Sequence, residues 1–319
     1  MALVFEEFAD LDCLAEDVRS EDPARRLVGV IALGESGQEE AIAILGGLVD
    51  DLDPVVRVHI AKALATFDGP ATASYLVRGL FDSEASVRSA AAASLAELKD
   101  TLTAEVLLPH VGHASEFVRA SVLRALKALR STASIPVAIA ALRDAAPEVR
   151  VQAVGVLAYL KREDTVLALT DGSRDQDAGV RRAAISALAF SKGTTAEEAI
   201  VTSLSDREWS VREAAAEALG SYHGAHALDA LTKALYDEYW QVRIKAVRSL
   251  GKLEATKAAL PIAESLAHQE PNLRKEAAAA LGEIAAPDVR PLLIAALTDP
   301  DADVRKNVRW ALARLPATP

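Results

Sequence analysis

The stretch DPDADVRKNVRWAL, residues 299–312, places Asp299 six positions before Arg305, ahead of a segment rich in Ala and Leu. The same spacing occurs far upstream, where DLDPVVR holds Asp51 and Arg57. A spacing that recurs at such a distance indicates either a paired-charge site or a structural unit that is repeated along the chain. The remaining copies of the spacing decide between these two possibilities.

An Arg recurs every 31 residues, and other positions keep the same register. Val precedes it in eight copies, Leu follows it by seven residues in all ten, and Asp lies six residues before it in seven. Ser20, His113 and His268 take the Asp position in the other three copies. The ten Arg residues lie at positions 26, 57, 88, 119, 150, 181, 212, 243, 274 and 305. This register predicts a chain built from repeated structural units and argues against a catalytic pair, because no copy differs from the rest.

Each unit is expected to form two helices. Counted from the repeated Arg, apolar residues at −1, +3, +4 and +7 make one face of a helix, and those at −12 and −8 predict a helix before it. Prolines at −3 suit the first turn of the second helix, so residues −6 to −3 should form the turn. Glycines near the end of that helix are expected to help the chain reverse. The prolines are Pro23, Pro54, Pro147 and Pro271, and the glycines are Gly34, Gly220, Gly251 and Gly282.

The chain resembles the HEAT-repeat family over its whole length, and in particular the 31-residue subtype named after the phycobilisome lyases. The turn with Asp and Arg, the Val-Arg pair and helices such as SVREAAAEALG at 210–220 carry the resemblance. It implies an all-α fold, a right-handed α-α superhelix of ten helix pairs. It also implies a ladder in which turn Asp and helix Arg residues stack along the solenoid.

The resemblance implies a single solenoid domain over residues 1–319, closed by caps at 1–20 and 303–319. In the first cap we expect an inner apolar stripe with an acidic opposite face. In the last repeat, Arg309 occupies the +4 position that is apolar elsewhere, which suits an uncovered end. The expected stripe consists of Val4, Phe8, Leu11, Ala15 and Val18.

Repeat 6 departs from the pattern at the end of its first helix. Gly172 and Ser173 lie at −9 and −8, where −8 is apolar in every other repeat. We therefore expect this helix to end early, near Thr170 or Asp171. Less apolar surface would then be buried between repeats 5 and 6, which favours local opening there.

Composition limits the classes of partner. Hydrophobic residues make up 51% of the chain but aromatic residues only 4%, and no apolar run is long enough for a transmembrane helix. The net charge of −11 argues against nucleic acid as a partner, although residues 240–319 are mildly basic. The single cysteine, Cys13, fits a reducing compartment. We expect a monomeric cytoplasmic protein that does not bind membranes.

The sequence contains no convincing pattern for catalysis, metal binding or cofactor binding. The pairs His110 with His113 and His223 with His226 have metal-ligand spacing, but the repeat places them at opposite edges of the solenoid. The stretch DGSRDQDAGVRR at 171–182 lacks the Gly and the Glu that a calcium loop requires. We predict no catalytic residue, no metal and no cofactor.

The variable face of the second helices is the candidate binding surface, because these helices line the concave side of HEAT solenoids. Trp209 and Trp240 share the −3 position in adjacent repeats, and exposed aromatic residues flanked by charge often dominate protein interfaces. Phe117 lies on the same ridge in repeat 4. The predicted protein-binding residues are Trp209, Glu213, Tyr236, Tyr239, Trp240, Lys245, Arg248 and Trp310.

These features favour a non-enzymatic scaffold, an adaptor or assembly factor that holds a protein or peptide in its concave groove. Two alternatives remain open. A bilin lyase, or an accessory subunit of one acting on phycobiliproteins, is implied by the subtype's name. A HEAT-like DNA-repair protein is the other alternative, although it would need a basic groove that this acidic chain supplies only weakly.

Overall fold

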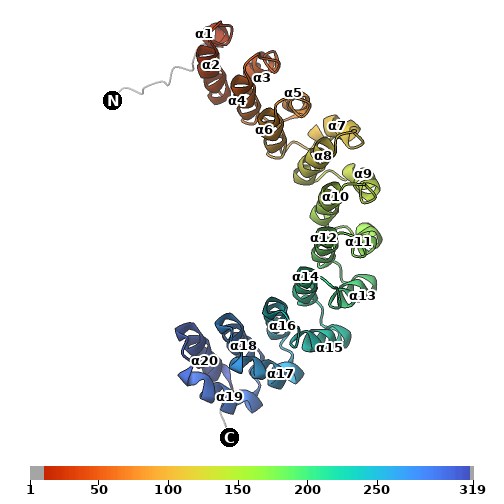
Figure 1. The fold of residues 1–319 in the computed structure, drawn as a ribbon, viewed down its shortest axis with the longest axis vertical. Helices are drawn as coiled ribbons and strands as arrows, with labels where there is room; N and C mark the ends of the chain where they lie inside the picture. Colours follow the sequence, from red (N-terminus) through yellow and green to blue (C-terminus); the bar gives the residue numbers. More distant parts are fainter. Residues whose placement is uncertain (1–10, 317–319) are drawn as a thin grey trace, which may run out of the picture. The chain divides into compact units, whose positions relative to one another are not determined.

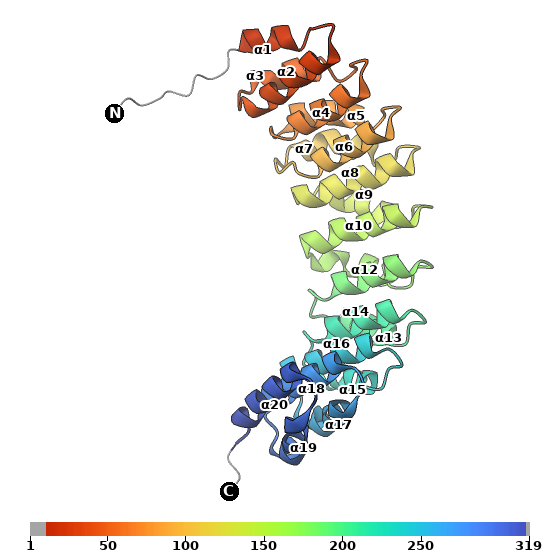
Figure 2. The ribbon, with the colours of Figure 1, turned by 60° about the vertical axis from the view of Figure 1, so that its left-hand side comes forward.

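The computed structural model describes residues 11–316, apart from the side chains of residues 12 and 13. The described part contains ten helix pairs and no strand, which confirms the predicted all-α fold. It divides into two compact units, residues 1–160 and 161–319, and within each unit the even-numbered and odd-numbered helices form two layers (Figures 1 and 2). The expected cap residues Val4 and Phe8 lie outside the described residues.

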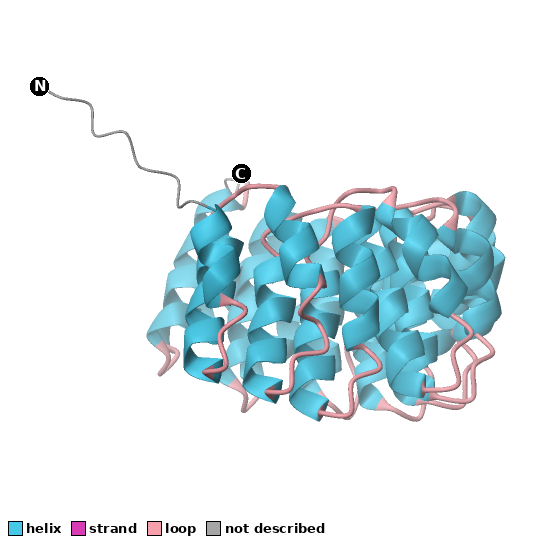
Figure 3. Cartoon of the chain, turned by 90° about the horizontal axis from the view of Figure 1, so that it is seen from above, coloured by secondary structure: helices cyan, strands magenta, loops and turns pink. Residues whose placement is uncertain are grey.

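Unit 1 contains five pairs, whose loops lie at the ends of the helices (Figure 3). Its helices are α1 Leu11–Asp17, α2 Pro23–Glu35, α3 Glu40–Gly46, α4 Pro54–Leu64, α5 Pro70–Gly79, α6 Ala85–Leu95, α7 Thr103–Leu107, α8 Glu116–Leu129, α9 Ser134–Ala141 and α10 Pro147–Leu160. A 3-10 turn, Leu108–His110, extends α7.

Unit 2 contains the other five pairs. Its helices are α11 Val166–Gly172, α12 Ala178–Leu188, α13 Thr194–Ser203, α14 Trp209–Leu219, α15 Ala225–Ala234, α16 Trp240–Lys252, α17 Ala259–Glu264, α18 Pro271–Ile284, α19 Arg290–Ala295 and α20 Ala302–Arg314. The 3-10 turns beside them are Glu163–Thr165, Thr256–Ala258, Ser265–Ala267, Pro287–Val289 and Ala296–Thr298.

Every even-numbered helix begins three residues before its repeated Arg, as the prolines at that position predicted. Asp22, Asp53 and Asp301 cap three of these helices by accepting hydrogen bonds from backbone N–H groups of the first turn. The Leu seven residues after the Arg is at most 1% exposed in the first nine repeats, from Leu33 to Leu281. Sequence register therefore fixes both the start of each helix and its buried face.

The end repeats differ from the internal ones much as expected. Arg309 is exposed in the last repeat, as predicted, and Leu312 is only half-buried there. Leu14 of α1 and Val18, which follows this helix, are buried, whereas Ala15 from the expected stripe is partly exposed. The first cap therefore packs through a face that is turned slightly from the one expected.

The glycines near the ends of the even-numbered helices have a different role from the one expected. Their φ angles are negative. The positive-φ reversals at the end of the second helix lie further along the chain, at Gly37, Arg130, Lys161, Glu254 and Ala285. A Cβ on Gly34 would lie 2.8 Å from Cβ of Ala63 on the next even-numbered helix. These glycines are needed because neighbouring helices approach closely, and the expectation that they assist the turn was wrong.

The first helix of repeat 6 does not end early. α11 continues to Gly172, nine residues before Arg181, and α5, α9, α13 and α15 end at the same position of their repeats. The Oγ of Ser173 donates to the carbonyl oxygen of Thr170 at 2.8 Å. A glycine and a serine are tolerated because they fall where the helix ends in any case, so the expectation of an early end was wrong.

Within each of the two units, Arg side chains join neighbouring repeats in the same geometry. Arg57 donates from Nε and Nη2 to the carboxylate of Asp82, at 2.7 and 3.0 Å, and from Nη1 to the carbonyl oxygen of Asp51 at 2.7 Å. Asp82 also accepts the N–H of Glu84, and the bond from Arg57 lowers the pKa of the Asp82 carboxyl. The other five pairs are Arg26–Asp51, Arg119–Asp144, Arg181–Asp206, Arg212–Asp237 and Arg274–Asp299. The ladder implied by the resemblance is therefore present.

Two histidines interrupt this ladder. Nδ1 of His113 accepts the N–H of Ser115 at 3.1 Å, and Nδ1 of His268 accepts that of Glu270 at 3.0 Å. Each ring thus performs the turn-capping role of the Asp that it replaces. It supplies no carboxylate to the Arg of the preceding repeat, Arg88 or Arg243, and neither Arg has an ion pair within the described residues.

Replacing Arg212 by Ala is expected to lower the free energy of unfolding by about 3 kcal/mol, because it leaves the Asp237 carboxylate buried without its guanidinium. Arg305→Ala is the matched control. Arg305 donates to the carbonyl oxygens of Asp299 and Pro300, so its loss should cost about 1 kcal/mol. Urea unfolding at neutral pH measures both values, and equal losses would contradict a ladder that strengthens internal repeats.

The second interruption of the ladder, at His268, predicts that the stability of the protein depends on pH. Burial lowers the pKa of His268, and the positive charges of Arg243 and Arg274 lower it further, against the opposing charge of Glu270. The unfolded chain therefore takes up a proton first as the pH falls through about 6.5, and the native state loses stability. Asn at this position can still accept the Glu270 N–H but does not titrate. Between about pH 7.5 and 5.5 the urea midpoint of the parent should fall more than that of His268→Asn, and parallel profiles would refute this prediction.

Candidate protein-binding surface

Four of the predicted aromatic residues lie along one edge of unit 2, where odd-numbered helices turn into even-numbered ones. Trp209 and Trp240 are the first residues of α14 and α16, and Tyr239 is the N-cap residue of α16. Tyr236 lies in the turn that follows α15. We call these four residues the turn-edge cluster. They lie at the ends of the even-numbered helices and not on their middle faces, where the groove was expected.

The centre of the turn-edge cluster is a stacked pair of rings. The centroids of Trp209 and Tyr239 are 5.8 Å apart and the ring planes differ by 16°. The guanidinium carbon of Arg212 lies 5.4 Å from the centroid of the Tyr239 ring. Because Asp237 holds Arg212 through two hydrogen bonds of 2.7 and 3.0 Å, the ladder also fixes the position of the aromatic pair.

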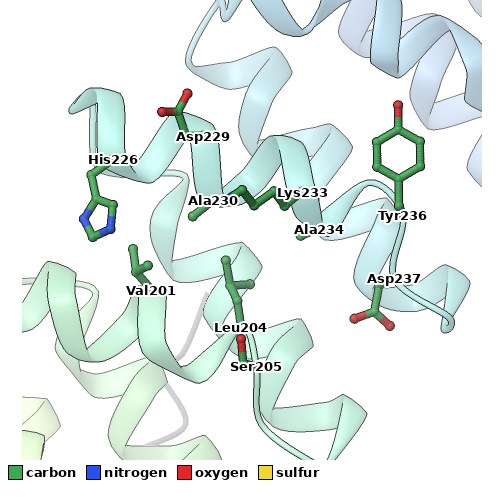
Figure 4. A pocket seen from close by; sticks show the side chains of 10 residues that line it. All are labelled: Val201, Leu204, Ser205, His226, Asp229, Ala230, Lys233, Ala234, Tyr236 and Asp237. Carbon is green, nitrogen blue, oxygen red and sulfur yellow. The ribbon is translucent and has the colours of Figure 1, made fainter.

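Tyr236 is the most exposed member of the turn-edge cluster, at 58%. Its hydroxyl donates to Oε2 of Glu264 at 3.1 Å. Tyr236 also lines a pocket of about 390 Å³ between α13 and α15, together with His226, Asp229 and Lys233 (Figure 4). The cluster therefore continues into a concave surface with both apolar and charged lining.

The charged residues predicted beside the rings are largely engaged within the protein. Nζ of Lys245 lies 3.0 Å from Oε2 of Glu217. Arg248 donates two hydrogen bonds of 2.7 Å to Glu276 on α18, and this contact lowers the pKa of the Glu276 carboxyl. The structure thus places these two cations in intramolecular ion pairs along the even-numbered layer. Glu213 is half-buried on the same layer.

Trp310 is separate from the turn-edge cluster and packs against its own neighbours. A Cβ on Gly282 would clash with the Trp310 ring, so the ring covers this glycine. The guanidinium of Arg314 lies 5.1 Å from the ring centroid on α20. Trp310 is still 44% exposed, but its contacts explain its presence without a partner.

A second concave surface, in unit 1, was not predicted from the sequence. A pocket of about 720 Å³ lies beside the ladder gap at Arg88 and His113, and Phe81 and Phe117 line it. Both rings are exposed, at 45% and 37%, and the centroids of Phe81 and His113 are 5.0 Å apart. The sequence marked this region through His113 in the Asp position and through Phe117, but neither residue indicated a pocket.

The described residues contain no group of three or more His, Cys, Asp or Glu side chains arranged to hold a metal ion. They also contain no helix with the length and apolar character needed to cross a membrane.

The comparisons with known proteins agree with the geometry. The family described as HEAT repeats matches residues 11–96, 135–219, 175–251, 197–271 and 259–319. No curated protein matches the chain. Two similar solved structures are an engineered protein and the Escherichia coli protein YibA, both with a TM-score of 0.53. The engineered protein is 21% identical, with 95% of this chain and 98% of the other covered. YibA is 19% identical, with 93% of this chain and 98% of the other covered.

A further similar structure is a chain from the complex of Kap95p with RanGDP, with a TM-score of 0.65 and 15% identity. The match covers 95% of this chain but 50% of the other, so this chain spans half the length of that one. At these identities the similarities show the fold alone.

Proposed function

Because the chain belongs to the HEAT-repeat family, we propose that it is a non-enzymatic scaffold, an adaptor or assembly factor that binds a protein or peptide partner. The observation that carries the proposal is the stacked pair of half-buried Trp209 and exposed Tyr239 along the turn edge of unit 2. We place the main contact there, at the edge of the even-numbered layer of unit 2. Kap95p, which has a similar fold, is seen in complex with RanGDP.

The energetics of aromatic residues support this surface. Trp and Tyr bury a large area while losing few rotatable bonds, so a small number of them can dominate the free energy of binding. The contact between Arg212 and Tyr239 holds the rings in place before any partner arrives, which lowers the entropic cost of association. Exposed aromatic residues on a rigid edge are thus well suited to bind a protein.

Changing Tyr236 and Tyr239 together to Ala should weaken partner binding by about 2 kcal/mol, roughly 30-fold in Kd. Both side chains are exposed, so the helical circular dichroism signal should stay unchanged. The parent and the variant would be immobilised and exposed to an extract of the native organism, and the Kd of the recovered partner would then be measured by calorimetry.

Tyr159→Ala is the matched control, because Tyr159 is an exposed Tyr in unit 1 that contacts an Arg in the same way, with Arg130 lying 4.7 Å from its ring centroid. This variant should bind as the parent does. If the double variant also binds with the parent's Kd, the turn-edge cluster is not the partner site.

The two alternatives have weaker support. The family match identifies HEAT repeats in general, so a bilin lyase role depends only on the resemblance to the 31-residue subtype. A DNA-repair role would require cations that are available to phosphates, yet Lys245 and Arg248 form ion pairs with Glu217 and Glu276. We therefore favour the scaffold function. The proposed protein is a single right-handed solenoid that is monomeric, cytoplasmic and without a cofactor.

A further inference from the structure

His113 takes the place of the Asp that would pair with Arg88, and we call this place the ladder gap of unit 1. Arg88 therefore keeps N–H groups that the other ladder Arg residues donate to a carboxylate. Nη1 of Arg88 donates to the carbonyl oxygens of Asp82 and Ser83, both at 2.7 Å, as the other ladder Arg residues do. In Arg57 and Arg119, the Nε and Nη2 groups hold Asp82 and Asp144. Among the described residues, the same two groups of Arg88 bind no carboxylate.

His113 adds a donor at this gap. Its Nδ1 accepts the N–H of Ser115, so the neutral imidazole carries its proton on Nε2. Arg88 and His113 both line the 720 Å³ pocket, together with Ser89 and Ser115. The polar side of the pocket is therefore rich in donors, as an anion requires.

The other side of the pocket is apolar. Leu80, Phe81, Phe117 and Val118 line it, and both Phe rings are exposed. Inorganic anions do not require such a wall, but a side chain of Leu or Phe size would bury apolar surface against it. The pocket thus presents a carboxylate-binding guanidinium next to a surface for one bulky apolar group.

We propose that this pocket, the Arg88 pocket, binds a partner peptide through an acidic side chain, with an adjacent bulky apolar side chain against Phe81 and Phe117. A carboxylate is the ligand because the equivalent Arg in neighbouring repeats already holds one by two parallel hydrogen bonds. A peptide is the carrier because it supplies the acidic and the apolar group side by side. The pocket lies within unit 1 and does not depend on the turn-edge cluster of unit 2.

The probe is the peptide acetyl-Gly-Leu-Asp-Leu-Gly-amide, and its Asn counterpart is the control. Side-chain Nε–Hε signals of Arg are followed by NMR during titration of the full chain. The Arg88 signal should shift in a saturable manner with the Asp peptide and should show at least about tenfold weaker binding with the Asn peptide. The Arg57 signal is the internal reference and should not move, because Asp82 already occupies its guanidinium.

Two matched variants separate binding from folding. His113→Asp restores the missing carboxylate, so it should raise the melting temperature and weaken binding of the Asp peptide at least about tenfold. His268→Asp makes the same repair at the gap beside Arg243 in unit 2. It should also raise the melting temperature but leave peptide binding unchanged.

Three results would overturn the proposal. His113→Asp could bind the Asp peptide as tightly as the parent, or His268→Asp could lose binding to the same extent. Alternatively, sodium acetate or inorganic phosphate could bind as tightly as the Asp peptide, which would indicate a simple anion site with no use for the Phe rings.

Discussion

The guanidinium fork of the repeated Arg is the interaction on which the rest of the fold depends. One side of the fork holds the carbonyl oxygens of its own turn, and the other holds the Asp of the next turn. A single side chain therefore fixes where an even-numbered helix begins and how the following repeat is placed against it. The side chains of both partners are mostly buried, so the loss of one partner leaves the other with little water to solvate its charge.

The two candidate surfaces are consequences of this same interaction. Where the rung is complete, at Arg212 and Asp237, the spare face of the guanidinium supports the Tyr239 ring. Where a rung is missing, at Arg88, the fork lies beside an apolar pocket. A regular ladder can thus create a binding surface in two ways. An aromatic side chain can pack on a complete rung, or the Asp of a rung can be replaced so that its Arg is left for another ligand.

The sequence predicted the features that repeat and missed those that depend on side-chain packing between repeats. Register alone located the helix starts and the buried Leu positions, because ten copies share one geometry. It could not show that Arg248 would reach Glu276 or that Trp310 would cover Gly282, since each contact depends on the residue that the next repeat happens to carry. For the same reason, His113 was recognised as unusual in the sequence, while its turn-capping bond and the pocket beside it required the structure.

The close helix contacts in unit 2 also determine how that unit bends. A Cβ on Gly220 would lie 2.7 Å from Oγ of Ser249, and one on Gly251 would lie 2.8 Å from Cβ of Ala280, so small residues keep the even-numbered layer narrow. The even-numbered layer of unit 2 is thus held together by contacts that leave no room for a Cβ, and α12 to α20 bend toward that layer (Figure 1). A larger residue at one of these glycines would push the two helices apart. The curvature that a partner meets can therefore change while the turns and the rungs of the ladder stay the same.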